Sequence, residues 1–94
     1  MAVRIFIKRN VKKGRTQEAV ELLKEVRSQA LKQPGYISGE TLINHYDPCK
    51  ITVVSTWQSI DDWIGWEESD ARSSKEGQLE GLLEGPTDFE IYDL

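Results

Sequence analysis

Few side chains in this sequence are suited to proton transfer or to holding an oxyanion. The chain of 94 residues has one histidine and one cysteine. A histidine or a carboxylate can act as a general base, and arginine, amide and phenol groups can stabilise a developing oxyanion. The side chains that we single out for such roles are His45, Arg4, Arg72, Glu40, Asn44 and Tyr36. Their spacing does not specify a catalytic constellation, and no Cys/His cluster has the spacing of a metal site.

His45 and Arg72 are the candidates for a catalytic role. His45 lies a few residues from an expected hairpin turn, where side chains usually face solvent, so exposure is the competing expectation. Arg72 falls in the first turn of an expected helix, where the helix dipole disfavours a cation. This position indicates a partner elsewhere in the molecule, although a surface salt bridge with Glu68 or Glu76 is the simpler explanation.

All three tryptophans of the chain lie within the stretch TWQSIDDWIGW. Trp63 shares a helical face with Ile60 and Ile64, which predicts that its ring packs in the core. Trp66 lies three residues further on, about 60° around the helix from that stripe. Its ring could form the wall of a pocket for a flat ligand or simply add to the core. Trp57 closes a strand and could serve either purpose.

The charge of the chain is unevenly distributed. Residues 1–47 carry nine Lys or Arg against five Asp or Glu, residues 48–94 carry three against eleven, and the net charge is −4. The basic residues gather in the first strand and turn, where they could attract an anionic ligand or, like most surface charges, simply be solvated. An acidic chain is poorly suited to nucleic acid, because neutralising phosphates supplies most of that affinity.

Length, cysteine content and hydropathy indicate the class of protein. The length suits a single domain, residues 1–94. The lone Cys49 excludes an intrachain disulfide. No apolar run is long enough for a signal peptide or a membrane span. We therefore expect a soluble cytoplasmic protein without a membrane partner, whose small core would gain from oligomerisation.

Alternation of apolar and polar residues predicts four strands, at residues 2–9, 36–45, 50–57 and 87–94. The turn residues YDPC separate the second strand from the third, so these two form an antiparallel hairpin.

Helical periodicity predicts two helical regions between the strands. The first begins at Thr16, a plausible N-cap, and stops at Pro34-Gly35. The second begins after Ser59, which with Asp62 forms an acidic variant of the capping box, and restarts near Ser69. Its later part ends before Gly85-Pro86 and has as its apolar positions Ala71, Leu79, Leu82 and Leu83.

The resulting order β-α-β-β-α-β predicts an α+β fold of the ferredoxin-like type, with a four-stranded antiparallel sheet and both helices on one face. Several strands carry large or apolar groups on both sides, such as Ile5 with Phe6 and Val53 with Val54. A strand with one solvated face would alternate apolar with polar residues. The second face therefore needs a cover, most simply another copy of the chain in a homodimer.

Three stretches together resemble the antibiotic biosynthesis monooxygenase (ABM) domain family: PGYISGE, VVSTWQSIDDWIGWEESD and the terminal FEIYDL. The resemblance covers essentially the whole chain. It implies a ferredoxin-like dimer whose two sheets join into an α/β-barrel. It also implies a pocket for a small molecule in each protomer, between sheet and helices, with Trp66 matching an aromatic of the pocket wall.

The same resemblance implies a monooxygenase that needs no metal, haem or flavin. Family members of this kind oxidise phenolic, quinol or polyketide-like substrates whose deprotonated form reduces dioxygen directly. The expected substrate-binding residues are Trp66, Trp57 and Tyr36. The expected partners are a small aromatic molecule, dioxygen and a second copy of the chain.

Other functions remain open to the same fold. Haem-degrading relatives share Trp66, but Ile7 and Glu76 stand where they have an asparagine and an iron-ligating histidine, which disfavours that activity. A dimeric protein that binds a small molecule without turnover is the main alternative. KITVVSTW lacks the glycines and aromatics of an RNA-binding strand, and one cysteine cannot form a metal-chaperone loop.

Overall fold

Four strands and three helices make up the chain in the computed structural model, which describes residues 1–94. The elements follow in the order β1 (Val3–Asn10), α1 (Thr16–Ala30), β2 (Tyr36–Ile43), β3 (Lys50–Trp57), α2 (Ile60–Glu67), α3 (Asp70–Glu80) and β4 (Asp88–Asp93). The strands form one sheet in the order β2-β3-β1-β4, and every neighbouring pair is antiparallel. This arrangement confirms the ferredoxin-like prediction, with the second helical region divided into α2 and α3.

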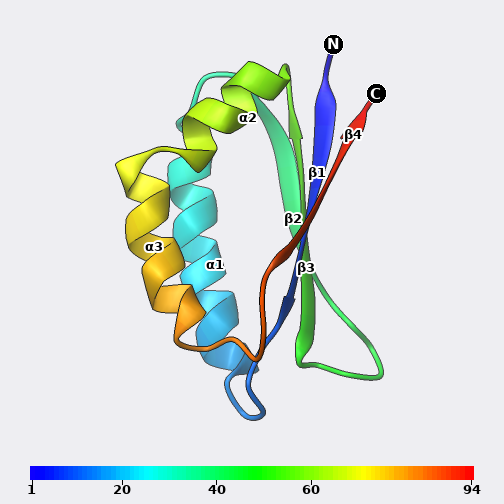
Figure 1. Ribbon diagram of the computed structural model, residues 1–94, viewed down its shortest axis with the longest axis vertical. Helices are drawn as coiled ribbons and strands as arrows, with labels where there is room; N and C mark the ends of the chain where they lie inside the picture. Colours follow the sequence, from blue (N-terminus) through cyan, green and yellow to red (C-terminus); the bar gives the residue numbers. More distant parts are fainter.

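The helices form one layer and the sheet another. Figure 1 shows α1, α2 and α3 on one side of the strands, while no helix covers the opposite face of the sheet. The two ends of the chain lie side by side at one end of the sheet, where the Leu94 amide donates to the Ala2 carbonyl at 2.9 Å (Figure 1). None of the helices has the length and apolar character needed to cross a bilayer.

The alternation along β1 separates the two faces of the sheet. Val3, Ile5 and Ile7 are buried against the helices, while Arg4 and Lys8 are exposed on the other side. Because side chains of a strand alternate with a period of two, Arg9 also faces the helices, and it is buried.

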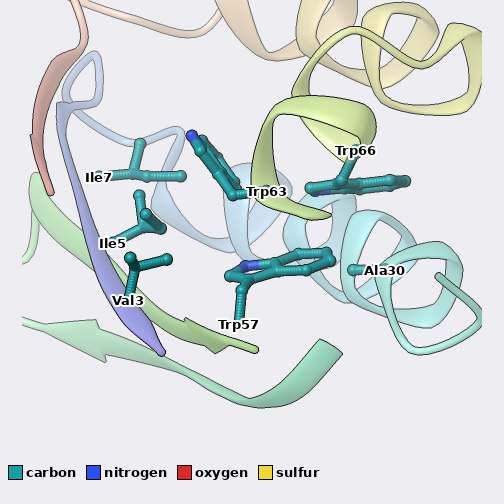
Figure 2. Close-up of a cluster of buried hydrophobic side chains, with 7 residues drawn as sticks. All are labelled: Val3, Ile5, Ile7, Ala30, Trp57, Trp63 and Trp66. Carbon is teal, nitrogen blue, oxygen red and sulfur yellow. The ribbon is translucent and has the colours of Figure 1, made fainter. Parts of the chain in front are cut away.

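Two clusters of apolar side chains fill the space between helices and sheet. The first contains Val3, Ile5, Ile7, Ala30, Trp57, Trp63 and Trp66 (Figure 2). The second contains Val11, Ala19, Leu23, Ile51, Leu79 and Leu82. Figure 2 shows the isoleucines and valine of β1 in a row that points toward the indole rings.

The buried face of α2 differs from the sequence prediction. Ile60 and Ile64 are 39% and 38% exposed, whereas Trp63 and Trp66 are buried. The prediction that Trp63 shares a core stripe with the two isoleucines is therefore wrong. The buried stripe runs through both tryptophans, whose larger apolar surfaces gain more from burial.

The first turns of α3 bury charge where an apolar residue was predicted. Ala71 is exposed, while Arg72 is buried and Glu76 half-buried on the face that also carries the buried Leu79. The prediction that Ala71 is a core position is wrong, because one step along a helix rotates the side chain by about 100°. Leu82 is buried as predicted, beyond the end of the helix.

Of the two predicted caps, Ser59 is confirmed and Thr16 is not, and Ser69 caps the helix at the predicted restart. The hydroxyls of Ser59 and Ser69 accept hydrogen bonds from the amides of Asp62 and Arg72, at 3.2 and 3.3 Å. Thr16 is not the N-cap of α1, because Arg15 occupies that position and the Thr16 hydroxyl donates to the Pro48 carbonyl instead.

The connection from α1 to β2 depends on the glycine of the predicted Pro34-Gly35 stop. Gly35 has φ of +81°, in the left-handed region that favours glycine. A Cβ atom on Gly35 would also collide with the side chain of Asp62 at the start of α2. This close approach holds α2 over the end of the sheet where β2 begins.

Candidate functional site

A cavity lies between the sheet and all three helices. Its volume is about 50 Å³. That is room for a few waters, so a ring-sized ligand requires the lining side chains to move apart. The lining residues are Ile7, Arg9, Leu23, Val26, Arg27, Ala30, Tyr36, Gly39, Glu40, Thr41, Val53, Ser55, Trp57, Trp63, Trp66, Arg72 and Glu76.

The three tryptophans form the aromatic part of this lining. Trp57 and Trp66 are stacked, with ring centroids 6.5 Å apart and 22° between their planes (Figure 2). Trp63 meets Trp57 edge-on at 6.0 Å. The Trp57 indole N–H donates to the Ser55 hydroxyl at 3.1 Å, which fixes the ring on the sheet. The expected division between a core Trp63 and a pocket-wall Trp66 does not hold, because both rings belong to the core and both line the cavity.

Tyr36 places a hydroxyl at the cavity from the first residue of β2. Its ring meets Trp57 edge-on, with centroids 5.2 Å apart. The Tyr36 hydroxyl lies over Gly39, where a Cβ atom would come within 2.5 Å of it. The absence of a side chain at Gly39 therefore makes the room that the phenol occupies.

Arg9, Arg72 and Glu76 form the largely buried charged part of the lining, while Arg27 and Glu40 are exposed. Arg9 Nη2 donates to Glu76 Oε1 at 2.7 Å, and Arg72 Nη2 lies 3.5 Å from the same oxygen. The side chains of Arg9, Arg72 and Glu76 are only 2%, 9% and 19% exposed. The two buried cations thus share one carboxylate of the lining.

The surroundings of Arg72 explain how a cation is kept in this position. Its guanidinium carbon lies 5.4 Å from the centre of the Trp63 ring and 5.9 Å from that of Phe89, so aromatic faces replace part of its hydration. Burial lowers the pKa of Arg72, and the attraction of Glu76 opposes that change.

The structure brings some of the predicted site residues together and leaves others apart. Trp57, Trp66, Tyr36 and Arg72 line the cavity, and Glu40 lies at its exposed rim. Arg72 forms the predicted ion pair with Glu76, but the pair is buried rather than on the surface.

The remaining candidates lie elsewhere. His45 is exposed in the loop between β2 and β3, against the ring of Tyr46. Asn44, in the same loop, accepts two backbone hydrogen bonds with its side-chain oxygen. Arg4 lies on the opposite face of the sheet, where it donates to the Thr56 hydroxyl. No three His, Cys, Asp or Glu side chains are grouped as metal ligands.

Sequence reasoning missed Arg9 and Glu76 as members of the site. The alternation that places Ile5 and Ile7 on the inner face of β1 extends to Arg9 and could have identified it. Glu76 lies one helical turn after Arg72, so any inward-facing Arg72 carries Glu76 with it. Both signals are overlooked when the charged residues of strands and helices are assumed to face solvent.

The lining combines properties that suit a flat, electron-rich molecule. Stacked indoles offer apolar faces to an aromatic ring. The guanidinium groups offer charge and hydrogen bonds to oxygen atoms on that ring, in surroundings where such interactions are stronger than in water.

Comparisons with known proteins bear on the family and the fold. The sequence model described as antibiotic biosynthesis monooxygenase (ABM) matches residues 2–74. No curated protein sequence matches the chain significantly.

Solved structures match over nearly the full length. A conserved protein from Methanosarcina mazei Go1 is 25% identical, with 98% of this chain and 91% of that chain covered and a TM-score of 0.92. SnoaB, a cofactor-independent oxygenase from Streptomyces nogalater, is 13% identical, with 99% and 92% covered and a TM-score of 0.90. Protein SO0527 from Shewanella oneidensis is 20% identical, with 97% and 88% covered and a TM-score of 0.88.

Proposed function

Because this chain belongs to the antibiotic biosynthesis monooxygenase family, we propose that it is a cofactor-independent monooxygenase that oxidises a small aromatic, quinol or polyketide-like substrate with dioxygen. The observation that carries the proposal is the buried cavity whose wall contains Trp57, Trp63 and Trp66 and whose charged part contains Arg9 and Arg72. The description of SnoaB as a cofactor-independent oxygenase supports the reaction type.

The reaction begins with loss of a proton from the substrate. The resulting anion is electron-rich, and positive charge beside it lowers the free energy of the ionised form. Arg9 and Arg72 supply that charge. Glu76 is the carboxylate that the cavity offers as proton acceptor.

The oxidation itself can be written without another reagent. The substrate anion gives one electron to dioxygen, and the resulting radical and superoxide combine to form a carbon–oxygen bond. The peroxide takes up a proton, and cleavage of its O–O bond with loss of the second hydrogen from carbon releases water. In the balance for a ring methylene, the methylene and one dioxygen become a ring carbonyl and one water.

Oxygen uptake tests this proposal. Purified protein is mixed with hydroquinones, phenols and anthrones in an oxygen electrode, and products are analysed by mass spectrometry with ¹⁸O2. We expect one labelled oxygen atom in the product for each dioxygen consumed. Heat-unfolded protein is the control for spontaneous oxidation.

Dialysis against a chelator tests the independence from metal. The protein-dependent rate should be unchanged after dialysis. A rate that falls and returns with added metal would contradict cofactor independence, and no protein-dependent uptake on any substrate would contradict the monooxygenase assignment.

A binding protein without turnover is the second candidate. It is favoured by the small volume of the cavity and by the position of the only histidine, His45, outside it. Saturable quenching of tryptophan fluorescence by aromatic compounds, without oxygen uptake, would establish this alternative.

We also propose that two copies of the chain pair through the uncovered face of the sheet. That face carries Phe6, Leu42, Val54 and Tyr92, and the rings of Phe6 and Tyr92 meet edge-on at 5.5 Å. Leu42 and Tyr92 are exposed. A contiguous apolar surface of this kind favours a protein partner, and a second copy satisfies it by symmetry.

We place this activity in the cytoplasm. The single cysteine, Cys49, is free, as is usual for proteins of a reducing compartment.

A further inference from the structure

We propose that the charged part of the cavity is a carboxylate-binding subsite, formed by Arg9 and Arg72, and that the natural ligand is an aromatic carboxylate. This inference rests on the proposed function only in taking the cavity as the ligand site. It adds a requirement on the ligand: a fixed negative charge that lies beside the tryptophan wall.

Unsatisfied hydrogen-bond donors are the first observation. Only three buried side-chain nitrogen or oxygen atoms of the protein lack a hydrogen-bond partner, and they are Arg9 Nε, Arg72 Nη2 and the Tyr36 hydroxyl. All three residues line the same cavity. Buried polar groups are nearly always paired, and each exception costs stability. The two unpaired arginine atoms belong to side chains that share Glu76, and together they indicate a missing acceptor. The Tyr36 hydroxyl lies beside Gly39, further along the sheet.

The charge of the cavity is the second observation. Glu76 Oε1 is 2.7 Å from Arg9 but 3.5 Å from Arg72, and the latter distance is an ion pair without a hydrogen bond. Within the lining, one largely buried carboxylate stands against two buried guanidinium groups, and Glu67 attracts Arg72 from outside the lining. Arg27 at the rim is exposed, and Glu40 lies opposite Val54 of the uncovered face, so neither supplies a carboxylate inside the cavity. A ligand carboxylate would give the second guanidinium a partner within the cavity.

Geometry favours a carboxylate over other anions. Guanidinium groups present planar, forked donors that match the two oxygens of a carboxylate. The apolar wall disfavours inorganic tetrahedral anions, because phosphate and sulfate have no apolar surface to place against it. Trp66 and Trp57 lie in the same lining, so a ring attached to the carboxylate would have an apolar surface to pack against.

Matched pairs of small ligands test the subsite. Benzoate is compared with benzamide, and acetate with acetamide, by isothermal titration calorimetry at constant ionic strength. Each pair has nearly the same shape and differs in charge, and the smaller pair needs little rearrangement of the lining. We expect each anion to bind at least about tenfold more tightly than its amide, as charge-assisted hydrogen bonds imply.

Three variants test which residues cause the preference for anions over amides. Arg72→Met should abolish it, and Arg72→Lys should restore part of it. Glu76→Gln should strengthen benzoate binding severalfold, because it removes the carboxylate that competes for both arginines, whereas a merely structural Glu76 would weaken it. Lys75→Met is the matched control, since Lys75 lies on the same helix but pairs with Glu25 outside the cavity, and its preference should equal that of the unaltered protein.

Thermal unfolding gives a second readout for variants of low stability. Benzoate should raise the melting temperature of the Glu76→Gln protein more than that of the unaltered protein, and benzamide should raise neither. Equal binding of anion and amide, no binding of either anion, or weaker benzoate binding by Glu76→Gln would overturn the subsite.

These outcomes are distinct from those of the proposed function. Preference for benzoate without oxygen uptake on any substrate would retain the subsite and remove the monooxygenase. Oxidation of neutral hydroquinones without any preference for anions would retain the monooxygenase and remove the carboxylate subsite.

Discussion

Trp66 serves two purposes at once, as part of the apolar core and as part of the cavity wall. Its ring is 3% exposed and is stacked on Trp57, so its removal leaves a large void. A ring in this position is held by packing on one side and is available to a ligand on the other. Stability and binding should therefore respond differently to changes in its size.

Trp66→Ala should lower the free energy of unfolding by about 3–5 kcal/mol, as buried tryptophans do when truncated. Trp66→Phe should cost less stability and still weaken binding of aromatic ligands, because a smaller ring covers less of the bound molecule. Urea denaturation and calorimetry measure the two effects. Unchanged affinity and rate in Trp66→Phe would mean that the ring belongs to the core alone.

Arg9 is the most deeply buried charge of the cavity, and its loss leaves Glu76 without its closest partner. Arg9→Met should lower the free energy of unfolding by about 1.5–3 kcal/mol, because it removes the charged hydrogen bond to Glu76 while Arg72 still offsets the charge of that carboxylate. Urea denaturation measures the loss.

Lys24→Met is the control for Arg9, because Lys24 pairs with Glu21 on the exposed side of α1. It should change stability little, as exposed ion pairs contribute little. Equal losses in the two variants would contradict the special position of Arg9.

At the scale of the elements, the start of α3 determines where Arg72 points. The Ser69 hydroxyl accepts from the Arg72 amide, so the cap and the site share one residue. Ser69→Ala should lower the free energy of unfolding by about 1 kcal/mol and should weaken ligand binding as well.

Ser73 lies one turn further along α3, is exposed and has no cap role. Ser73→Ala should therefore change the free energy of unfolding by less than about 0.5 kcal/mol. Chemical denaturation of both variants checks the cap. A loss in Ser73→Ala as large as that in Ser69→Ala would assign the effect to helix propensity instead.

The sequence predicted the elements well because their signals are local. Alternation in β1 and the turn between β2 and β3 depend only on near neighbours, and both predictions are confirmed. The Ser59 and Ser69 caps are equally local, since each bonds an amide three residues on.

Two of the failures involve partners that are distant in sequence. Thr16 is not a cap because its hydroxyl bonds to Pro48, in a loop that the local pattern cannot place. Arg72 replaces Ala71 on the inner face of α3 because an ion pair with Glu76 and the faces of Trp63 and Phe89 accommodate it. A charged site buried in the core is invisible to a rule that counts apolar residues.

At the scale of the whole molecule, the uncovered face of the sheet leads to a prediction about assembly. Light scattering at micromolar concentration should give twice the mass of one chain. Phe6→Lys should shift the protein to the mass of one chain, because it places a charge in the centre of the proposed interface. The sheet register puts Phe6 between Val54 and Glu90, on the two neighbouring strands.

Leu31→Lys is the control for Phe6, since Leu31 is an exposed apolar residue at the end of α1, away from that face. It should leave the mass unchanged. A monomer in the unaltered protein would remove the proposed dimer while leaving the cavity and its ligand chemistry in place.

The hydrogen bond from the Leu94 amide to the Ala2 carbonyl keeps the two ends of the chain together, which bears on whether the order of the elements along the chain can be changed. Since both ends meet beside β1 and β4, a short linker could close the backbone into a ring. The exposed loop at residues 44–49 would then be the natural position for a new opening. Such a circular permutant would begin at β3 and finish at β2, with every strand pair of the sheet retained. The cavity should therefore tolerate a change in chain order, and a split there would yield two fragments whose reassembly could report on ligand binding in cells.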